Sequence, residues 1–261
     1  MIRFLLAAAY STDGINWTGL GIILPASMNC GIWNGNKWVA GGKNSFNSFQ
    51  KIAYSSDGFT WTPVNLPYSS IMCTSVIWGF NRFVATTIGA GANQGKSIAY
   101  SFDGITWNAA SIFNSLDDAY SVAWNGKVFV AVGSGFSQSM MYSSDGINWN
   151  AVVGSSTIFT TGYGVTWNGK VFIAVGTGNN TIAISGNGQI WYGMGNSYMP
   201  TGLGVGSNSL FGGSVIDSQF NINPDSNFIS EIPGLEVSSP EFYNLNYTTY
   251  NMRIESSNTL T

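Results

Sequence analysis

Short runs of alternating apolar and polar residues recur along residues 1–217, and turn-forming residues separate the runs. Runs rich in β-branched and aromatic residues, bounded by Gly, Asn, Asp and Ser, predict short strands joined by tight turns. In the clearest copy we expect four strands, at Ser121–Trp124, Val128–Gly133, Met140–Ser143 and Ile147–Val152. No segment shows helical periodicity, so the pattern predicts an all-β protein.

Two motifs alternate along this region with a period of roughly 43 residues, the size of one four-stranded propeller blade. The first is Ser-x-Asp-Gly-x-x-Trp, and its worn last copy begins at Ser185. The second is Trp-Asn-Gly, which begins at Trp33, Trp124 and Trp167 and becomes Trp-Gly-Phe-Asn at Trp78. Asn-Gly between apolar runs is typical of a hairpin whose two turn residues both have positive φ. Each repeat is therefore expected to contain two hairpins.

The order of the repeats predicts a closed ring. The chain opens with the second half of a repeat at Phe4–Leu20 and ends its repeats with a first half at Gly202–Asp217. Pairing these halves completes a fifth blade and leaves no open sheet edge. We therefore expect a five-bladed β-propeller of four-stranded antiparallel blades over residues 1–217. The tail, residues 218–261, has no repeat motif and is expected to be an extended or β segment that packs on the ring or mediates assembly; a degenerate sixth blade is the alternative.

The Ser, Asp and Trp residues of the first motif are expected to be structural. An Asp in a tight turn accepts backbone N–H groups, and the Trp that follows is buried between strands. A catalytic residue would also not be repeated in every blade. The residues of this structural set are Ser11, Asp13, Trp17, Ser55, Asp57, Trp61, Ser101, Asp103, Trp107, Ser143, Asp145, Trp149 and Trp191.

The variable connections are expected to carry any binding site. Both repeated turns join strands at the same end of a blade, so the remaining connections gather on the opposite face, where binding loops of rigid scaffolds usually lie. These connections offer aromatic rings beside amide side chains, a combination that suits sugars. The alternative is that these aromatic residues merely plug the loops and the channel. The candidate ligand face comprises Asp117, Asp118, Tyr120, Tyr68, Phe113, Phe136, Tyr192, Tyr198, Asn93 and Asn179.

Composition narrows the possible chemistry. Only 8% of residues are charged and the net charge is −3, which argues against a nucleic acid as the main partner. The chain contains no His, so it lacks the commonest general base and metal ligand. Asp117 and Asp118 are adjacent and read as a turn rather than as a facing carboxylate pair. Cys30 and Cys73 are expected to be small buried hydrophobic residues. We expect no catalytic residues, no metal and no cofactor.

Localisation follows from the apolar runs. None approaches the roughly 18 residues of a membrane span. The start of the chain, Met-Ile-Arg-Phe-Leu-Leu-Ala-Ala-Ala-Tyr, runs directly into the first repeat. We interpret it as part of a strand rather than a signal peptide. A cytoplasmic or virion-associated protein is expected.

The repeated Ser-x-Asp-Gly-x-x-Trp motif resembles the Asp box of sialidase-like (BNR-repeat) propellers, although the Asp and Gly are adjacent here. This shortened form, the Trp-Asn-Gly hairpins and the ending Leu-Glu-Val-Ser-Ser-Pro-Glu-Phe-Tyr-Asn resemble repeat proteins of giant DNA viruses. Sialidase chemistry requires a cluster of arginines, and this chain has only Arg3, Arg82 and Arg253. We therefore expect a non-enzymatic binding or structural propeller, or a virion component, whose variable face meets a glycan or protein. A glycoside hydrolase using Asp118 and a tail-driven homo-oligomeric assembly module are the alternatives.

Overall fold

The computed structural model describes residues 8–11, 13–21, 24, 27–44, 49–89, 96–112 and 116–206. These residues form an all-β fold with one short helix, α1 (Ser155–Ile158), which confirms the predicted fold class at this level. The strands are, in chain order, β1 (Ala8–Tyr10), β2 (Thr18–Gly21), β3 (Ser27–Trp33), β4 (Trp38–Lys43), β5 (Ile52–Ser55), β6 (Thr62–Val64), β7 (Met72–Gly79), β8 (Arg82–Ile88), β9 (Ile98–Ser101), β10 (Asn108–Ala109), β11 (Ser111–Ile112), β12 (Asp118–Trp124), β13 (Phe129–Ser134), β14 (Met140–Ser143), β15 (Asn148–Ala151), β16 (Thr161–Trp167), β17 (Phe172–Thr177), β18 (Ile182–Ser185) and β19 (Tyr192–Gly193).

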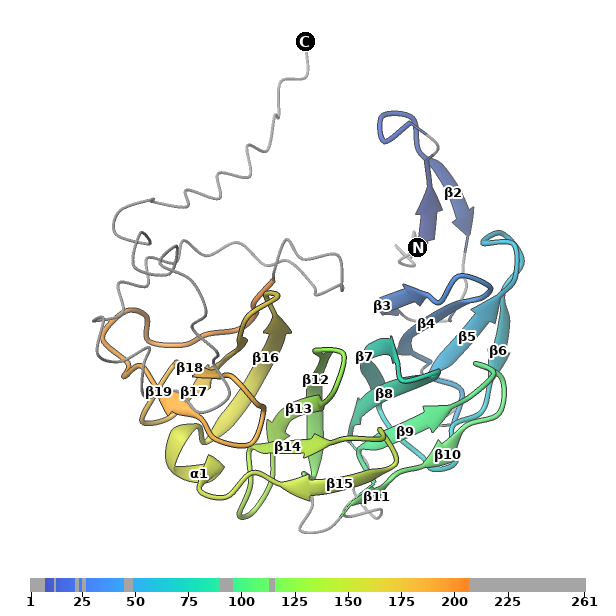
Figure 1. The fold of residues 1–261 in the computed structure, drawn as a ribbon. Helices are drawn as coiled ribbons and strands as arrows, with labels where there is room; N and C mark the ends of the chain where they lie inside the picture. The colour runs from blue at the N-terminus through green and yellow to red at the C-terminus, as the bar shows by residue number, and fades with distance from the viewer. Residues whose placement is uncertain are drawn as a thin grey trace.

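The strands are grouped into four-stranded antiparallel units that follow the sequence repeats. Unit 1 contains β3 to β6, unit 2 β7 to β10, unit 3 β12 to β15 and unit 4 β16 to β19. Two pairings link the units: β4 meets β7 at Lys43 and Met72, which joins units 1 and 2 into one eight-stranded sheet, and β11 pairs in parallel with β15 of unit 3. The hairpin β1–β2 forms a separate two-stranded sheet. Figure 1 shows the units curling around the middle of the molecule as an open arc, with β3, β7, β12 and β16 on its inside. We call these four strands the inner strands.

The observed strands match the expected ones closely in the clearest repeat. In unit 3 the register pairs Trp124 with Phe129 in the first hairpin and Tyr142 with Asn150 in the second, so both expected strand pairs form. The inner strand is longer than expected because it begins at Asp118, which pairs with Ser134. Asp117 and Asp118 therefore lead into a strand, which corrects the expectation that they form only a turn.

Each Ser-x-Asp-Gly-x-x-Trp motif, labelled an Asp box below after the motif it resembles, holds its turn with a dense set of local hydrogen bonds. In unit 3 the Asp145 carboxylate oxygen Oδ1 accepts the backbone N–H groups of Ile147 and Asn148, both at 2.8 Å, and the Ser143 hydroxyl at 2.9 Å. The Trp149 indole N–H donates to the Gly146 carbonyl at 3.2 Å. The same contacts recur at the other boxes, with Asn187 in place of Asp in unit 4. These residues therefore fix the backbone of the turn.

The Trp-Asn-Gly turns differ from the expected two-residue hairpin. In unit 1 the turn spans the four residues between Trp33 and Trp38, and only Gly35 has a positive φ, of 95°. The Asn34 side chain closes the turn by accepting the N–H groups of Asn36 and Lys37. The two-residue turn with both φ values positive occurs instead in unit 2, at Phe80 and Asn81. Asn therefore serves here through its side-chain oxygen, as in other Asx turns.

The two kinds of repeated turn lie together at one face, as the topology predicts. Lys37, in the first turn of unit 1, donates from Nζ to the backbone carbonyl of Asp103, in the Asp box of unit 2, at 2.9 Å. The Asp box of unit 3 likewise lies against unit 2, because a Cβ built on Gly146 would stand 3.3 Å from the Arg82 side chain. The Asp boxes of units 2 and 3 thus also fasten their units to the preceding one.

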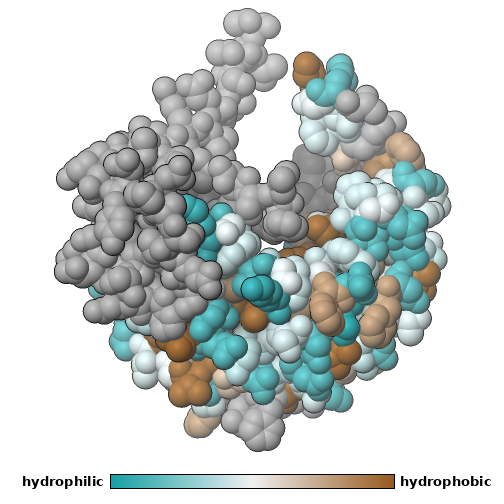
Figure 2. Space-filling model, in the orientation of Figure 1, coloured by the Kyte–Doolittle hydropathy of each residue, from teal (hydrophilic) through white to brown (hydrophobic). Residues whose placement is uncertain are grey.

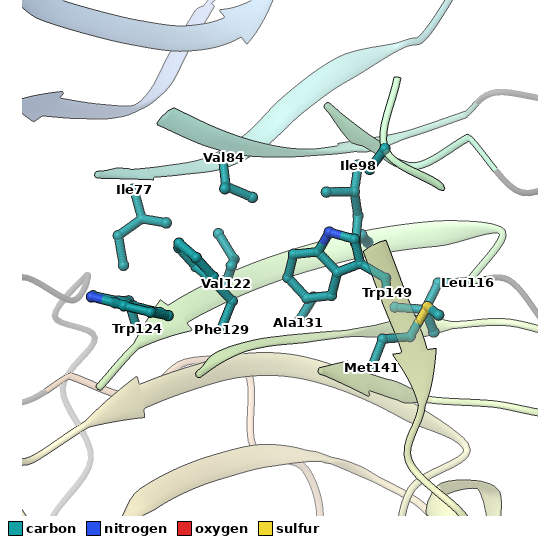
Figure 3. Packing of buried hydrophobic residues seen from close by; sticks show 12 residues of the cluster. Ile77, Val84, Ile98, Leu116, Val122, Trp124, Phe129, Ala131, Met141 and Trp149 are labelled. Carbon is teal, nitrogen blue, oxygen red and sulfur yellow. The ribbon is translucent and has the colours of Figure 1, made fainter. Parts of the chain in front are cut away.

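The core lies between the units. One cluster combines Ile77, Val84 and Ile98 of unit 2 with Phe129 and Trp149 of unit 3, and Figure 3 shows these side chains converging from both sheets. Equivalent clusters join units 1 and 2 and units 3 and 4. Burial between neighbouring sheets therefore holds the arc together.

Within the described ranges, no helix is long and apolar enough to cross a membrane. The expected closing strands beyond residue 206 and the tail, residues 218–261, lie outside the described residues.

Candidate functional site

All four inner strands carry a β-bulge at the same position of the repeat. The register slips by one residue between Met28 and Cys30, and equivalent slips occur in β7, β12 and β16. A bulge re-aims a side chain and is over-represented next to binding and active sites. The bulged residues, which we call the inner row, are Asn29, Thr74, Tyr120 and Tyr163.

The inner row lies toward the variable-loop end of the inner strands, because each strand reaches the repeated turns only after its Trp. Its side chains are partly or fully exposed and reach from one unit to the next. Asn29 donates to the Cys73 carbonyl at 3.2 Å, and the Thr74 hydroxyl donates to the Ala119 carbonyl at 2.7 Å. The rings of Tyr120 and Tyr163 lie 5.4 Å apart, centre to centre, with an interplanar angle of 59°. The row is therefore continuous across all four units.

The phenol of Tyr120 is held in its neutral form. Partial burial, and next the nearby Asp118 carboxylate, raise its pKa, while a hydrogen bond with Ser134 acts in the opposite direction. A neutral hydroxyl can both donate and accept a hydrogen bond. The Asp118 carboxylate is itself engaged, since its Oδ1 accepts the backbone N–H of Gly89 at 2.7 Å. Asp118 thus ties unit 3 to the end of β8 and stands beside the tyrosine pair.

The residues of the candidate ligand face predicted from sequence do not all lie together in the structure. Asp118 and Tyr120 lie together, and Asp117 is an exposed neighbour. Phe136 and Tyr198 are exposed on separate loops, at 102% and 64% of their full surface. Asn179 is exposed and donates to the Thr157 carbonyl in α1, and Tyr192 is half-buried in β19, paired with Ile184. Asn93 and Phe113 lie outside the described residues.

Tyr68 belongs to the core, which corrects its assignment to the ligand face. Its side chain is buried against the cluster between units 1 and 2, and its hydroxyl accepts a hydrogen bond from Thr87 at 3.2 Å. Burial raises the pKa of Tyr68 well above its usual value. The loop that carries it therefore folds inward over the sheet.

Three residues of the inner row were missed by sequence reasoning: Asn29, Thr74 and Tyr163. A signal for the bulge does exist, because glycine faces it on the neighbouring strand in three units. A Cβ at Gly42, Gly133 or Gly176 would overlap the carbonyl oxygen of the bulged strand. Glycine inside a strand marks such a close backbone approach.

No three Asp, Glu, Cys or His side chains among the described residues lie close enough to hold a metal ion. Figure 2 shows hydrophilic and hydrophobic side chains interspersed over the described part of one face. The inner row instead combines aromatic rings, an amide and hydroxyl groups, which are binding groups for a neutral polar ligand.

No protein-family model matches the chain, and no curated protein matches it. Among solved structures, it is similar to the computationally designed Ika8 protein, with a TM-score of 0.44 and 9% sequence identity. That match covers 63% of this chain and 47% of the designed one, so the chain spans about half the length of the protein it matches.

Proposed function

We propose that the four units belong to a closed five-bladed Asp-box β-propeller. Support comes from residues 202–206, which lie on unit 4 much as the start of β16 lies on unit 3. Gly202 donates its backbone N–H to the Gly176 carbonyl at 3.0 Å, and Val205 packs against Val175 and Ile182. A Cβ on Gly202 would stand 2.6 Å from the Val175 Cβ, as one on Gly162 would stand 2.8 Å from the Val132 Cβ.

These residues are the start of a fifth inner strand in this proposal. Leu203 then occupies the inner-row position, and it is 65% exposed. The hairpin β1–β2 supplies the outer half of the same blade. Pairing of the two halves leaves no open sheet edge, which is how propellers avoid edge-to-edge aggregation.

Closure is tested by Trp17→Ala. Trp17 is 65% exposed in the hairpin β1–β2, whereas its counterpart Trp149 is 1% exposed. In a closed ring Trp17 is buried between the fifth blade and unit 4, as Trp149 is between units 3 and 2, so the substitution is expected to lower the free energy of unfolding by about 1.5 kcal/mol. The measurement is urea unfolding followed by circular dichroism. A change below about 0.5 kcal/mol, typical of an exposed position, contradicts closure.

We further propose that the protein binds a neutral glycan without catalysis, using the inner row. The observation that carries this proposal is the bulge at one position in all four inner strands. A single bulge can be a local accommodation, but four equivalent ones bring one side chain of each unit into a common row. The row is placed where a propeller has the mouth of its channel.

The chemistry of the row favours a sugar. The apolar face of a pyranose packs on aromatic rings, and the half-buried Tyr120 and Tyr163 provide two such rings. Sugar hydroxyl groups need donors and acceptors, and the tyrosine hydroxyls supply both. The oxygen atoms of Thr74 and Asn29, whose donors bind backbone carbonyls of the next unit, add acceptors. Asp118 adds an acceptor and disfavours an acidic sugar.

Binding is favoured over hydrolysis by the arrangement of acids. A glycosidase needs two carboxyl groups facing each other across about 5–9 Å. Within the described part of the chain, the Asp118 carboxylate already accepts a backbone N–H group. Asp117 is the residue directly before Asp118 in the same segment, so the two carboxylates cannot face each other across a sugar. The resemblance to repeat proteins of giant DNA viruses makes a virion surface a setting where such a ring would meet host glycans.

The glycan proposal is tested on an array of neutral oligosaccharides, followed by calorimetric titration of the strongest binder. Tyr120→Ala and Tyr163→Ala are each expected to weaken binding about 10-fold, because each removes one stacking ring. Phe102→Ala is the matched control: Phe102 is an exposed ring, at 57%, in the Asp box on the opposite face.

An array without any bound glycan contradicts the proposal and would direct the search to a protein partner. Equal weakening by the Phe102 variant would also contradict it, because the effect would then come from the fold rather than from the inner row. Circular dichroism of each variant separates these cases. Unchanged spectra with lost binding place the ligand at the tyrosine pair.

A further inference from the structure

Cys30 and Cys73 are the two cysteines of the chain, and the fold brings them together between units 1 and 2. Their sulfur atoms lie 3.9 Å apart, with one thiol donating to the other, although 43 positions separate them in sequence. Cys73 is buried, as expected from sequence, whereas Cys30 is half-buried, which corrects its expected burial. The pair lies directly beside the inner row, since Asn29 precedes Cys30 and Thr74 follows Cys73.

The neighbouring strand leaves space for both sulfur atoms. Gly41 of β4 lies under the pair, and a Cβ there would overlap both thiols. The equivalent residues in the other units, Thr86, Val132 and Val175, all have branched side chains. In unit 1, therefore, glycine occupies this position, and the two cysteine side chains fill the space that a larger residue fills in the other units. The three residues form one local arrangement.

We propose that Cys30 and Cys73 form an intramolecular disulfide under oxidising conditions, which makes a redox-sensitive staple between the inner strands β3 and β7. A disulfide places its sulfur atoms about 2.0 Å apart. In the oxidised form that we propose, rotation of the two side chains about their Cα–Cβ bonds closes the 3.9 Å gap, and Gly41 presents no side chain against the sulfur atoms.

Hydrogen peroxide is the oxidant that we propose for this pair, because it is small. The half-buried Cys30 thiol reacts first and becomes a sulfenic acid, while peroxide is reduced to one water. The Cys73 sulfur then attacks the Cys30 sulfur, loses its proton and releases a second water as the S–S bond forms. In total two thiols and one peroxide give one disulfide and two waters. The hydrogen bond with Cys30, together with burial, raises the pKa of Cys73, which keeps it a protonated thiol until that step.

The staple would join units 1 and 2 covalently. It closes a loop of 43 residues, and crosslinks across loops of this length restrict the unfolded chain strongly. It would also fix Asn29 relative to Thr74, because the bonded sulfur atoms lie next to both residues. Oxidation thereby stabilises the ring and rigidifies one half of the inner row.

The test uses the full chain, treated with hydrogen peroxide or with a reducing agent, then denatured and labelled with maleimide. The expected result is two labelled cysteines after reduction and none after oxidation, with a linked Cys30–Cys73 peptide in the non-reduced digest. Oxidation is expected to raise Tm by about 5–10 °C. Persistent labelling of both thiols, sulfinic acid at Cys30 with Cys73 free, or a linked dimer would each overturn the proposal.

The repeats provide two control variants that should fold. Cys30→Ser places at this position the residue that units 2 and 3 have there, Ser75 and Ser121, and Cys73→Ala copies Ala119 of unit 3. Both variants are expected to keep their Tm within about 3 °C of the reduced protein and to show no rise on peroxide treatment. A rise in either variant would assign the stabilisation to another oxidation and overturn the staple.

Discussion

Replacing Trp149 by Ala is expected to lower the free energy of unfolding by about 3–5 kcal/mol, the cost of emptying a large buried aromatic site. Trp149 is 1% exposed and packs against unit 2 and unit 3 together. Its ring lies 6.3 Å from that of Phe129, and its N–H donates to the Gly146 carbonyl at 3.2 Å. The substitution removes both the contact between the units and the hydrogen bond that closes the Asp box.

The measurement is urea unfolding at neutral pH followed by far-ultraviolet circular dichroism. Phe136→Ala is the matched control, because Phe136 is 102% exposed and should change stability by less than about 0.5 kcal/mol. Trp149→Phe restores most of the ring without the N–H group, so it should fall between the wild type and the Ala variant. Equal stability of the Ala variant and the Phe136 control would show that the boundary between units 2 and 3 contributes little.

The repeats made much of the fold predictable. Strand positions followed from the alternation of apolar residues, as the register of Phe129 with Trp124 and Ser143 shows. The structural role of the Asp-box turns was also predictable, because the short Asp side chain reaches only backbone N–H groups close to it in sequence. Local signals of this kind depend on the nearest residues alone. They are therefore readable without knowledge of the tertiary contacts.

The candidate site was less predictable because it depends on contacts between repeats. Tyr120 was assigned to the ligand face from its variable connection, but Tyr163 was missed, and the two rings meet only because two inner strands lie side by side. Tyr68 shows the converse case, since its loop looked exposed but folds over the core. The proximity of Cys30 to Cys73 likewise arises from the packing of units 1 and 2. The period of the sequence repeat alone does not predict which way these side chains point.

The glycines that face the bulges are a local sequence signal for contacts that form only in the folded protein. Gly133 was counted as the end of an expected strand, but its lack of a side chain is what lets the Asp118 carbonyl approach. A repeated glycine at one position of a strand therefore predicts a bulge on the partner strand, and with it the residue that the bulge re-aims. Applied to this chain, that rule leads from Gly133 to Tyr120 and from Gly176 to Tyr163. The site could then have been anticipated from local patterns.

Asp145→Ala is expected to lower the free energy of unfolding by about 2–3 kcal/mol, because the backbone donors of Ile147 and Asn148 lose their acceptor. Asp145→Asn is the matched control, since Asn187 accepts the equivalent N–H groups in unit 4 at 2.9 and 3.0 Å. The Asn variant should therefore lose less stability than the Ala variant, because it keeps the acceptor and lacks only the charge. If both variants lose the same amount, the negative charge rather than the acceptor geometry supports the turn.

The same carboxylates set the response of the fold to acid. Partial burial acts to raise the pKa of Asp145, but the hydrogen bonds from Asn148, Ile147 and Ser143 outweigh it and lower the pKa to about 2. The N–H groups of Thr60 and Phe59 lower the pKa of Asp57 to about 2 as well. A carboxyl with a lower pKa in the folded state stabilises the fold above its unfolded pKa of about 3.9 and loses that contribution as the pH falls toward 2. Urea midpoints measured from pH 6 to pH 2 should therefore fall below pH 4, and less steeply in Asp145→Asn, which has one titrating box fewer. Identical profiles for the two proteins would contradict a role of the Asp145 charge, and would leave the turn dependent on the neutral acceptor that Asn187 already provides.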